Sequence, residues 1–161
     1  DIPAVKCAGK CNIPDGEVYT APVRDSINGV ITYNTPSEMN GFTFENVKLT
    51  FKDGKIVECD GNDKARLEKV FNTDEGARYV GEFAIGVNPY ITKAMNNILF
   101  DEKIGGSMHM AIGEAFQEAG GKNESAIHWD MINDMTKEGR IYADGELFYE
   151  NGRFKEELLE M

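Results

Sequence analysis

Both histidines of the chain lie in one mainly apolar stretch between Leu99 and Met131. His128 stands in the run A-I-H-W-D-M, two residues before Asp130. In an extended strand, successive side chains point to opposite faces, so His128 and Asp130 would share one face and Trp129 would lie on the other. On a helix the two would diverge by roughly 200°. An H-x-D pair on a strand offers one nitrogen and one oxygen to a cation, so the spacing predicts a metal-binding pair.

The other histidine, His109, stands in the run S-M-H-M-A-I-G. Strand alternation would place His109 with Ala111 and Gly113 on one face, and the larger apolar side chains on the other. These small neighbours leave room beside the imidazole. The alternative interpretation is that both histidines are ordinary core residues whose ring nitrogens bond to the backbone, and spacing alone leaves it open.

An acidic residue also stands in an apolar setting. The run Y-V-G-E-F-A-I-G-V, residues 79–87, is apolar on both faces, as a buried strand is, and Glu82 lies in its middle. A lone buried carboxylate takes up a proton, or else needs a cation or several hydrogen-bond donors nearby. We therefore interpret Glu82 as a functional residue rather than an unpaired structural one.

The candidate ligands are carboxylates and imidazoles without a thiolate: Glu17, Glu82, Glu102, His109, His128 and Asp130. Such a set suits divalent ions such as Zn²⁺, Co²⁺ or Mn²⁺, and it is rich for a single tetrahedral zinc. It is large enough for two divalent metal ions bridged by carboxylate and water, the arrangement that serves hydrolysis. Glu17 directly follows the turn P-D-G, where a glutamate is usually solvated, so its place in the set carries little weight by itself.

The elements that must position these residues are mostly strands. The runs V-I-T-Y, V-K-L-T-F and K-I-V-E-C, residues 30–33, 47–51 and 55–59, read as strands, and Asp53-Gly54 joins the last two in a hairpin. Turns at Asp144-Gly145 and Asn151-Gly152 predict two more hairpins, which would close the sheet.

Helices are expected to be short. The pattern predicts one at residues 64–71, capped by Asn62 or Asp63, and another at residues 91–100. Residues 155–161 read as a short acidic helix or a frayed end. The sequence therefore predicts one domain over residues 1–161, of the α+β class, mainly antiparallel and with three or four short helices.

Composition narrows the classes of function. The chain has 17 Lys and Arg against 28 Asp and Glu, a formal net charge of -11, which argues against a nucleic-acid partner. There is no apolar run long enough to span a membrane and no secretory leader. The spacing of Cys7, Cys11 and Cys59 fits neither a zinc ribbon nor a redox pair, so we expect free thiols and a cytoplasmic location.

Four ordered motifs resemble a known family. They are N-I-P-D-G-E-V-Y-T-A-P, G-E-F-A-I-G-V-N-P, L-F-D-E-K-I-G-G-S-M-H-M-A-I-G and H-W-D-M-I, and they resemble the catalytic half of the thermophilic-type metallo-aminopeptidases, the aminopeptidase T and S family. The resemblance runs from about Asn12 to the end. It implies that Glu17, Glu82, His109, His128 and Asp130 match the dinuclear metal ligands, with Glu102 also at the metal site. It further implies hydrolysis of N-terminal residues from peptides, with two metals activating a bridging water.

Within this resemblance, Glu82 and Glu102 are the two candidates for the catalytic proton acceptor, and the sequence leaves the choice between them open. The chain departs from the family at Phe116, where many relatives carry a tyrosine beside the metals. The family is also more than twice as long, so we expect its N-terminal α/β half, which forms part of the substrate cleft, to be missing here. The expected partners are a peptide substrate, that N-terminal domain and a second copy in a homodimer.

Two other interpretations remain. A non-haem iron oxygenase could use H-x-D with a distant histidine as a facial triad. In the pattern known for that class the third ligand follows the H-x-D, whereas here His109 precedes it, and Glu17 and Glu82 would be surplus. The second alternative is a non-catalytic, metal-stabilised dimerisation module.

Overall fold

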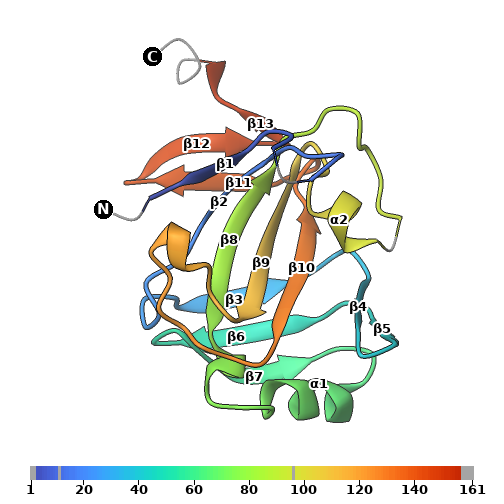
Figure 1. Ribbon diagram of the computed structural model, residues 1–161, viewed down its shortest axis with the longest axis vertical. Helices are drawn as coiled ribbons and strands as arrows, with labels where there is room; N and C mark the ends of the chain where they lie inside the picture. The colour runs from blue at the N-terminus through green and yellow to red at the C-terminus, as the bar shows by residue number, and fades with distance from the viewer. Residues whose placement is uncertain (1–2, 11, 96, 157–161) are drawn as a thin grey trace.

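The computed structural model describes residues 3–10, 12–95 and 97–156, and its centre is a five-stranded antiparallel sheet (Figure 1). The strands follow the order β1-β2-β8-β9-β10. Their bounds are β1 (Val5–Cys7), β2 (Glu17–Thr20), β8 (Val80–Gly86), β9 (Ser107–Gly113) and β10 (His128–Asp134). Strands β8 to β10 are almost wholly buried, in keeping with their near-continuous apolar sequences.

A second sheet packs against one face of the first, and a helix lies at its lower edge in Figure 1. This sheet consists of β3 (Gly29–Thr32), β6 (Lys48–Lys52) and β7 (Lys55–Asp60), and the helix is α1 (Lys64–Phe71). The β6–β7 hairpin turns at Asp53-Gly54 as predicted, with φ of 48° and 79°. Asp63 caps α1 by accepting the backbone N–H of Arg66 at 3.0 Å, which settles the choice between Asn62 and Asp63.

The main hydrophobic core lies between these layers. Met108, Met110 and Ile112 of β9, with Trp129 and Met131 of β10, pack against residues of β6, β7 and α1. The small hairpin of β4 (Ser37–Met39) and β5 (Phe42–Phe44) covers the side of β10. Alternation along β9 and β10 is therefore as predicted, and the opposite face of the sheet is left for polar side chains.

The helices are fewer than the sequence pattern predicts. The described residues contain two α-helices, α1 and α2 (Ile98–Asp101), with the 3₁₀ turns η1 (Gly76–Arg78) and η2 (Gln117–Ala119). The predicted helix at residues 91–100 is largely wrong, because only its last part is helical; Asn96 and residues 157–161 lie outside the described residues. The carboxylate of Asp101 accepts hydrogen bonds from the backbone N–H groups of Met95 and Asn97. In a helix over residues 91–100, the Met95 N–H would instead be needed for a backbone hydrogen bond within that helix.

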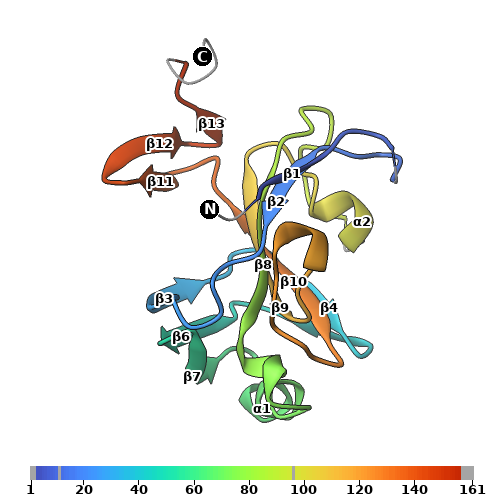
Figure 2. The same ribbon diagram turned by 60° about the vertical axis from the view of Figure 1, so that its left-hand side comes forward.

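The tail forms the two predicted hairpins but does not close the main sheet. Its strands are β11 (Arg140–Ala143), β12 (Glu146–Glu150) and β13 (Arg153–Phe154), which make a separate three-stranded sheet. Figure 2 shows this sheet standing away from β8 to β10. The chain turns at the end of β10, where Asp134 accepts both the N–H and the hydroxyl of Thr136.

Two further expectations concern cysteines and membranes. Cys7 and Cys59 are free thiols, as predicted, and Cys11 lies outside the described residues. Among the residues described, no helix has the length and apolar character needed to cross a membrane.

Candidate metal centre

The central strands place the predicted residues on the sheet face opposite the main core. Ala111 of β9 pairs with Glu82 of β8 on one side and with Asp130 of β10 on the other. His109, two residues before Ala111, lies on the same face, next to Ala84. The small side chain of Ala111 therefore leaves space in which both acids and His109 can approach one another.

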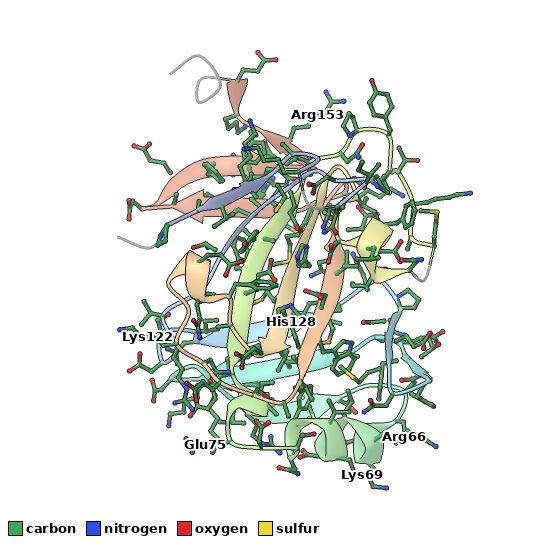
Figure 3. All side chains as sticks on the ribbon, viewed as in Figure 1. Arg66, Lys69, Glu75, Lys122, His128 and Arg153 are labelled. Atoms are coloured by element: carbon green, nitrogen blue, oxygen red, sulfur yellow. The ribbon has the colours of Figure 1, made fainter. Side chains whose placement is uncertain are left out.

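The two edges of this face supply the remaining residues. Glu17 at the start of β2 pairs with Gly86 of β8, and His128 at the start of β10 pairs with Gly113 of β9. A Cβ at either glycine would meet backbone, the carbonyl of Ile104 at Gly86 and that of Ile127 at Gly113, so both positions need glycine for these close approaches. Figure 3 labels His128 by the lower ends of β9 and β10. Glu102 approaches from the end of α2.

Glu82 lies between the histidines. Its Oε1 is 3.7 Å from Nε2 of His109, and its Oε2 is 3.4 Å from Nε2 of His128. Asp130 Oδ1 lies 3.6 Å from the same His128 nitrogen, and 3.9 Å from that of His109. Each oxygen of Glu82 thus faces a different imidazole, which is the geometry of a carboxylate that bridges two cations.

These separations fit metal ligands better than hydrogen bonds. Two atoms that each bind a tetrahedral zinc at about 2.0–2.1 Å lie roughly 3.4 Å apart. Several buried atoms here have no hydrogen-bond partner: Glu17 Oε2, both ring nitrogens of His109, and Asp130 Oδ1. Buried polar atoms are rarely left unpaired, so their convergence is the signature expected of a cation site. The residues present therefore fit divalent metal.

Ligand atoms gather in three overlapping groups among the described residues, and one of them, Cys7, Asp15 and Glu17, includes a thiol and two residues outside the predicted set. Glu82, His109 and Asp130 each offer one atom within 4.8 Å of the others, and so do Glu17, Glu102 and His109. Glu17 Oε2 is 3.5 Å from Nε2 of His109. The structure thus brings all six predicted residues into one cluster. His109 has no backbone partner among the described residues, unlike an ordinary core histidine, whereas one ring nitrogen of His128 does contact a backbone carbonyl.

A hydrogen bond to the backbone fixes the orientation of the His128 ring. Its Nδ1 lies 2.8 Å from the carbonyl oxygen of Glu114, so a proton on Nδ1 is donated there and Nε2 faces the carboxylates. Such a bond to the remote nitrogen is typical of histidines that bind metal. The ring of Phe116 packs against the other side, with its centroid 4.9 Å from that of His128. Phe116 therefore lies beside the cluster but offers no hydroxyl.

Sequence reasoning missed Lys103. Its side chain is fully buried, and its Nζ donates to Glu17 Oε1 at 2.9 Å and contacts Glu102 Oε1. Burial disfavours its charge, but the two carboxylates outweigh that effect and raise the pKa of Lys103, so it stays an ammonium. A lysine directly after a glutamate is normally a surface residue, and no pattern in the chain signals this burial.

The charges of the cluster compensate one another when no cation is bound. Burial raises the pKa of Glu82, but the neighbouring His109 and His128 outweigh it and lower that pKa to about 2. Burial lowers the pKa of His128, but Asp130 and Glu82 outweigh it and raise that pKa to about 11. Protonated histidines thus balance the negative charge of the carboxylates, and metal ions that bind here would displace these protons.

A cleft of about 410 Å³ opens beside the cluster. It lies between β10, the β4–β5 hairpin and α2, and His128 and Asp130 line one wall of it. Met39 and Ile98 contribute apolar surface to the other walls. The arrangement places a cavity large enough for an amino-acid side chain directly beside the candidate metal ligands.

Comparison with known proteins relates the chain to one family of metalloproteases. The family described as thermophilic metalloprotease (M29) matches residues 5–154. Aminopeptidase AmpS of Bacillus subtilis (strain 168) is 36% identical over 169 residues, covering 89% of this chain and 40% of that protein. Aminopeptidase T of Thermus thermophilus is 32% identical, covering 83% of this chain and 37% of that protein. The chain thus spans about two fifths of the length of these curated relatives.

Solved structures show the same fold. AmpT from Thermus thermophilus superposes with a TM-score of 0.76 at 30% identity, covering 96% of this chain and 44% of that one. A 2,5-dihydroxypyridine dioxygenase from Pseudomonas putida KT2440 superposes with a TM-score of 0.65 at 17% identity, covering 87% and 43%. At that identity the second likeness concerns the fold alone.

Proposed function

Because the chain belongs to the thermophilic metalloprotease (M29) family, we propose that it carries the metal centre of an aminopeptidase that removes N-terminal residues from peptides. One observation supports this most strongly: the two oxygens of Glu82 face the two histidines at 3.7 and 3.4 Å. That geometry suits a pair of divalent ions rather than one. The curated relatives it matches are named aminopeptidases.

We assign the ligands as two sets that share Glu82. Glu17 and His109 would hold one ion with Glu82 Oε1, and His128 and Asp130 would hold the other with Glu82 Oε2. When bound, such ions lower the pKa of a shared water and polarise the scissile carbonyl. Zn²⁺, Co²⁺ and Mn²⁺ all suit this donor set.

The proton acceptor is then Glu102 rather than Glu82. Glu82 has both oxygens directed at histidines and a pKa lowered to about 2, so it is a poor base. Burial raises the pKa of Glu102, and the neighbouring Lys103 offsets this only in part. A carboxylate with a raised pKa at the edge of the centre is suited to take a proton from water and to pass it to the leaving amine.

The cleft between β10, β4 and α2 is the proposed place for the N-terminal residue of the substrate. It adjoins His128 and Asp130, so a peptide bond at its mouth would lie against the metal ligands. We propose that the further length of the relatives, which this chain does not match, supplies other walls of the substrate cleft in those proteins. A homodimer and a cytoplasmic location also stay predictions.

The oxygenase alternative is not favoured. A facial triad needs only three ligands, whereas Glu17 and Glu82 also converge on His109, with unpaired atoms on Glu17 and His109. The likeness to a dioxygenase is a likeness of fold and carries no activity to this chain.

Calorimetric titration of the metal-free chain with Zn²⁺ or Co²⁺ at pH 8 tests the proposal. We expect saturable uptake of two ions, and a loss of both binding steps in Glu82→Gln, because that residue serves both positions. The matched control is Glu45→Gln, which changes an exposed glutamate. No saturable uptake by the unmodified chain, or unchanged uptake by Glu82→Gln, contradicts the proposal.

A further inference from the structure

The two proposed metal positions differ in their surroundings. On the His128 side, no lysine or arginine lies within ion-pair distance of Glu82 or Asp130 among the residues that the structure describes. On the His109 side, the buried ammonium of Lys103 touches both Glu17 and Glu102. Only the second position therefore shares its carboxylates with a permanent cation.

The contacts of Glu17 show how this sharing works. Its Oε1 accepts from Lys103 Nζ at 2.9 Å, and its Oε2 has no hydrogen-bond partner and lies 3.5 Å from His109 Nε2. One oxygen of Glu17 is thus committed to the lysine, and the other points to the metal position. Glu102 is likewise held through its Oε1.

We propose that Lys103 is a positioning residue that makes the two metal positions unequal, by holding one oxygen of Glu17 and one oxygen of Glu102 in ion pairs and so out of metal coordination. The inference rests on the proposed metal-dependent function. The position at Glu82, His128 and Asp130 fills first. The position at Glu17 and His109 binds more weakly, because Lys103 engages one oxygen of Glu17 and one of Glu102 and places a positive charge beside this position. The other oxygen of Glu102 then remains to accept a proton.

Neutral substitutions of Lys103 test this. In Lys103→Met both carboxylates are released and the repulsion disappears, so the weaker binding step should tighten about tenfold or more, since a unit charge this close to a divalent ion acts with little screening. Lys103→Gln, which retains hydrogen-bonding capacity, should change in the same direction. Lys103→Arg keeps the charge and should leave the weaker step weak.

A double variant shows whether Glu102 takes part. Adding Glu102→Gln to Lys103→Met should remove part of the gain, because the released carboxylate is one source of it. The matched control is Lys69→Met on α1, an exposed lysine that Figure 3 shows at the lower end of the molecule, below His128 and outside the cluster. Circular dichroism confirms that each variant is folded before it is titrated with Co²⁺ or Zn²⁺.

The possible outcomes distinguish a failure of the proposed role of Lys103 from a failure of the proposed metal-dependent function. Uptake of no metal by the unmodified chain overturns both. Two ions bound with equal affinity, or a weaker step that Lys103→Met leaves unchanged or weakens further, overturns the role of Lys103 alone. A tighter weak step in Lys103→Arg has the same consequence, because the charge is retained there. A merely structural lysine would lose metal affinity on substitution rather than gain it.

Discussion

At the scale of single residues, the two histidines have different surroundings although both face Glu82. His109 is almost fully buried and has no hydrogen-bond partner at either ring nitrogen. His128 is partly exposed, and its Nδ1 is held by the carbonyl of Glu114 at 2.8 Å. His128 is therefore the ligand that both the solvent and a substrate in the adjoining cleft can reach.

His128→Ala should remove one metal position and spare the other. The variant removes the imidazole that would bind one ion together with Asp130, so that binding step should weaken by about 100-fold or more. The other ion position, formed by His109, Glu17 and Glu82 Oε1, keeps all its ligands, so its binding step should persist. Calorimetry with Co²⁺ measures both steps. Glu150→Ala is the control, because Glu150 pairs with Arg140 and Lys155 in the separate sheet. Equal affinities for the two variants would show that His128 binds no metal.

Phe116→Tyr should raise turnover. The ring lies beside His128, with centroids 4.9 Å apart, so a hydroxyl on it would reach the region where charge develops on the substrate carbonyl. One donor of this kind is worth on the order of 10² in kcat. The assay is hydrolysis of leucine anilide with Co²⁺, and Phe148→Tyr on β12 is the matched control. An unchanged kcat in Phe116→Tyr would exclude this donor role.

Sequence alone could identify those candidate metal ligands that have strong local signals. His128 and Asp130 share a face because strands alternate, and Glu82 stands out because an acid inside an apolar strand needs a partner. Lys103 could not be found in this way. A lysine beside a glutamate is typical of a solvent-exposed surface, and its burial arises only when α2 folds against the start of β2.

At the scale of elements, most of the longer strands were predictable, whereas β1, the β4–β5 hairpin and the extent of the helices were not. The turn residues Asp53-Gly54 and the capping Asp63 act locally, so their positions could be predicted from neighbouring residues. The segment before α2 depends instead on Asp101, whose buried carboxylate takes the N–H groups of Met95 and Asn97. Side-chain capture of backbone donors overrides a favourable helical pattern there.

The contact of α1 with η1 should make stability depend on pH. Arg78 donates to Glu68 at 2.6 Å, and Cys59 also donates to that carboxylate, so the pKa of Glu68 is lowered. A carboxylate with a lowered folded-state pKa stabilises the protein above its unfolded pKa of about 4.3, and this contribution is lost as the pH falls through the folded value.

Thermal unfolding of the unmodified chain and of Glu68→Gln checks this. We expect Glu68→Gln to have the lower Tm near neutral pH, and the difference to shrink as the pH falls below about 4. The contribution is modest, because the Glu68 side chain is 38% exposed and solvent screens the pair. Glu58→Gln on β7 alters an exposed glutamate and serves as the control. A Tm difference that does not vary with pH would assign the effect to packing rather than to charge.

At the scale of the whole molecule, the two faces of the main sheet differ in role: one packs into the core and the other carries the polar cluster. The face of β9 and β10 with Met110 and Trp129 packs into the main core, and the face with His109 and Asp130 carries the polar cluster. Buried unpaired atoms are therefore tolerated on one face because the other face supplies apolar burial. The separate β11–β13 sheet stands outside both layers (Figure 2), and no sequence pattern distinguished its hairpins from ones that would extend the main sheet.

The 161-residue chain should bind metal but hydrolyse peptides slowly. Among the residues that the structure describes, β10, the β4–β5 hairpin and α2 border the cleft that His128 and Asp130 line, whereas the curated relatives contain a further part of their length that this chain does not match. Orientation of a substrate and exclusion of water contribute several kcal/mol to lowering a barrier, so a cleft without further walls should cost orders of magnitude in kcat/KM. The measurement is hydrolysis of leucine anilide with Co²⁺ by this chain and by full-length aminopeptidase T of Thermus thermophilus. Calorimetry confirms that both proteins bind the same number of metal ions. Equal kcat/KM values would show that the walls around the metal centre of this chain already suffice for catalysis.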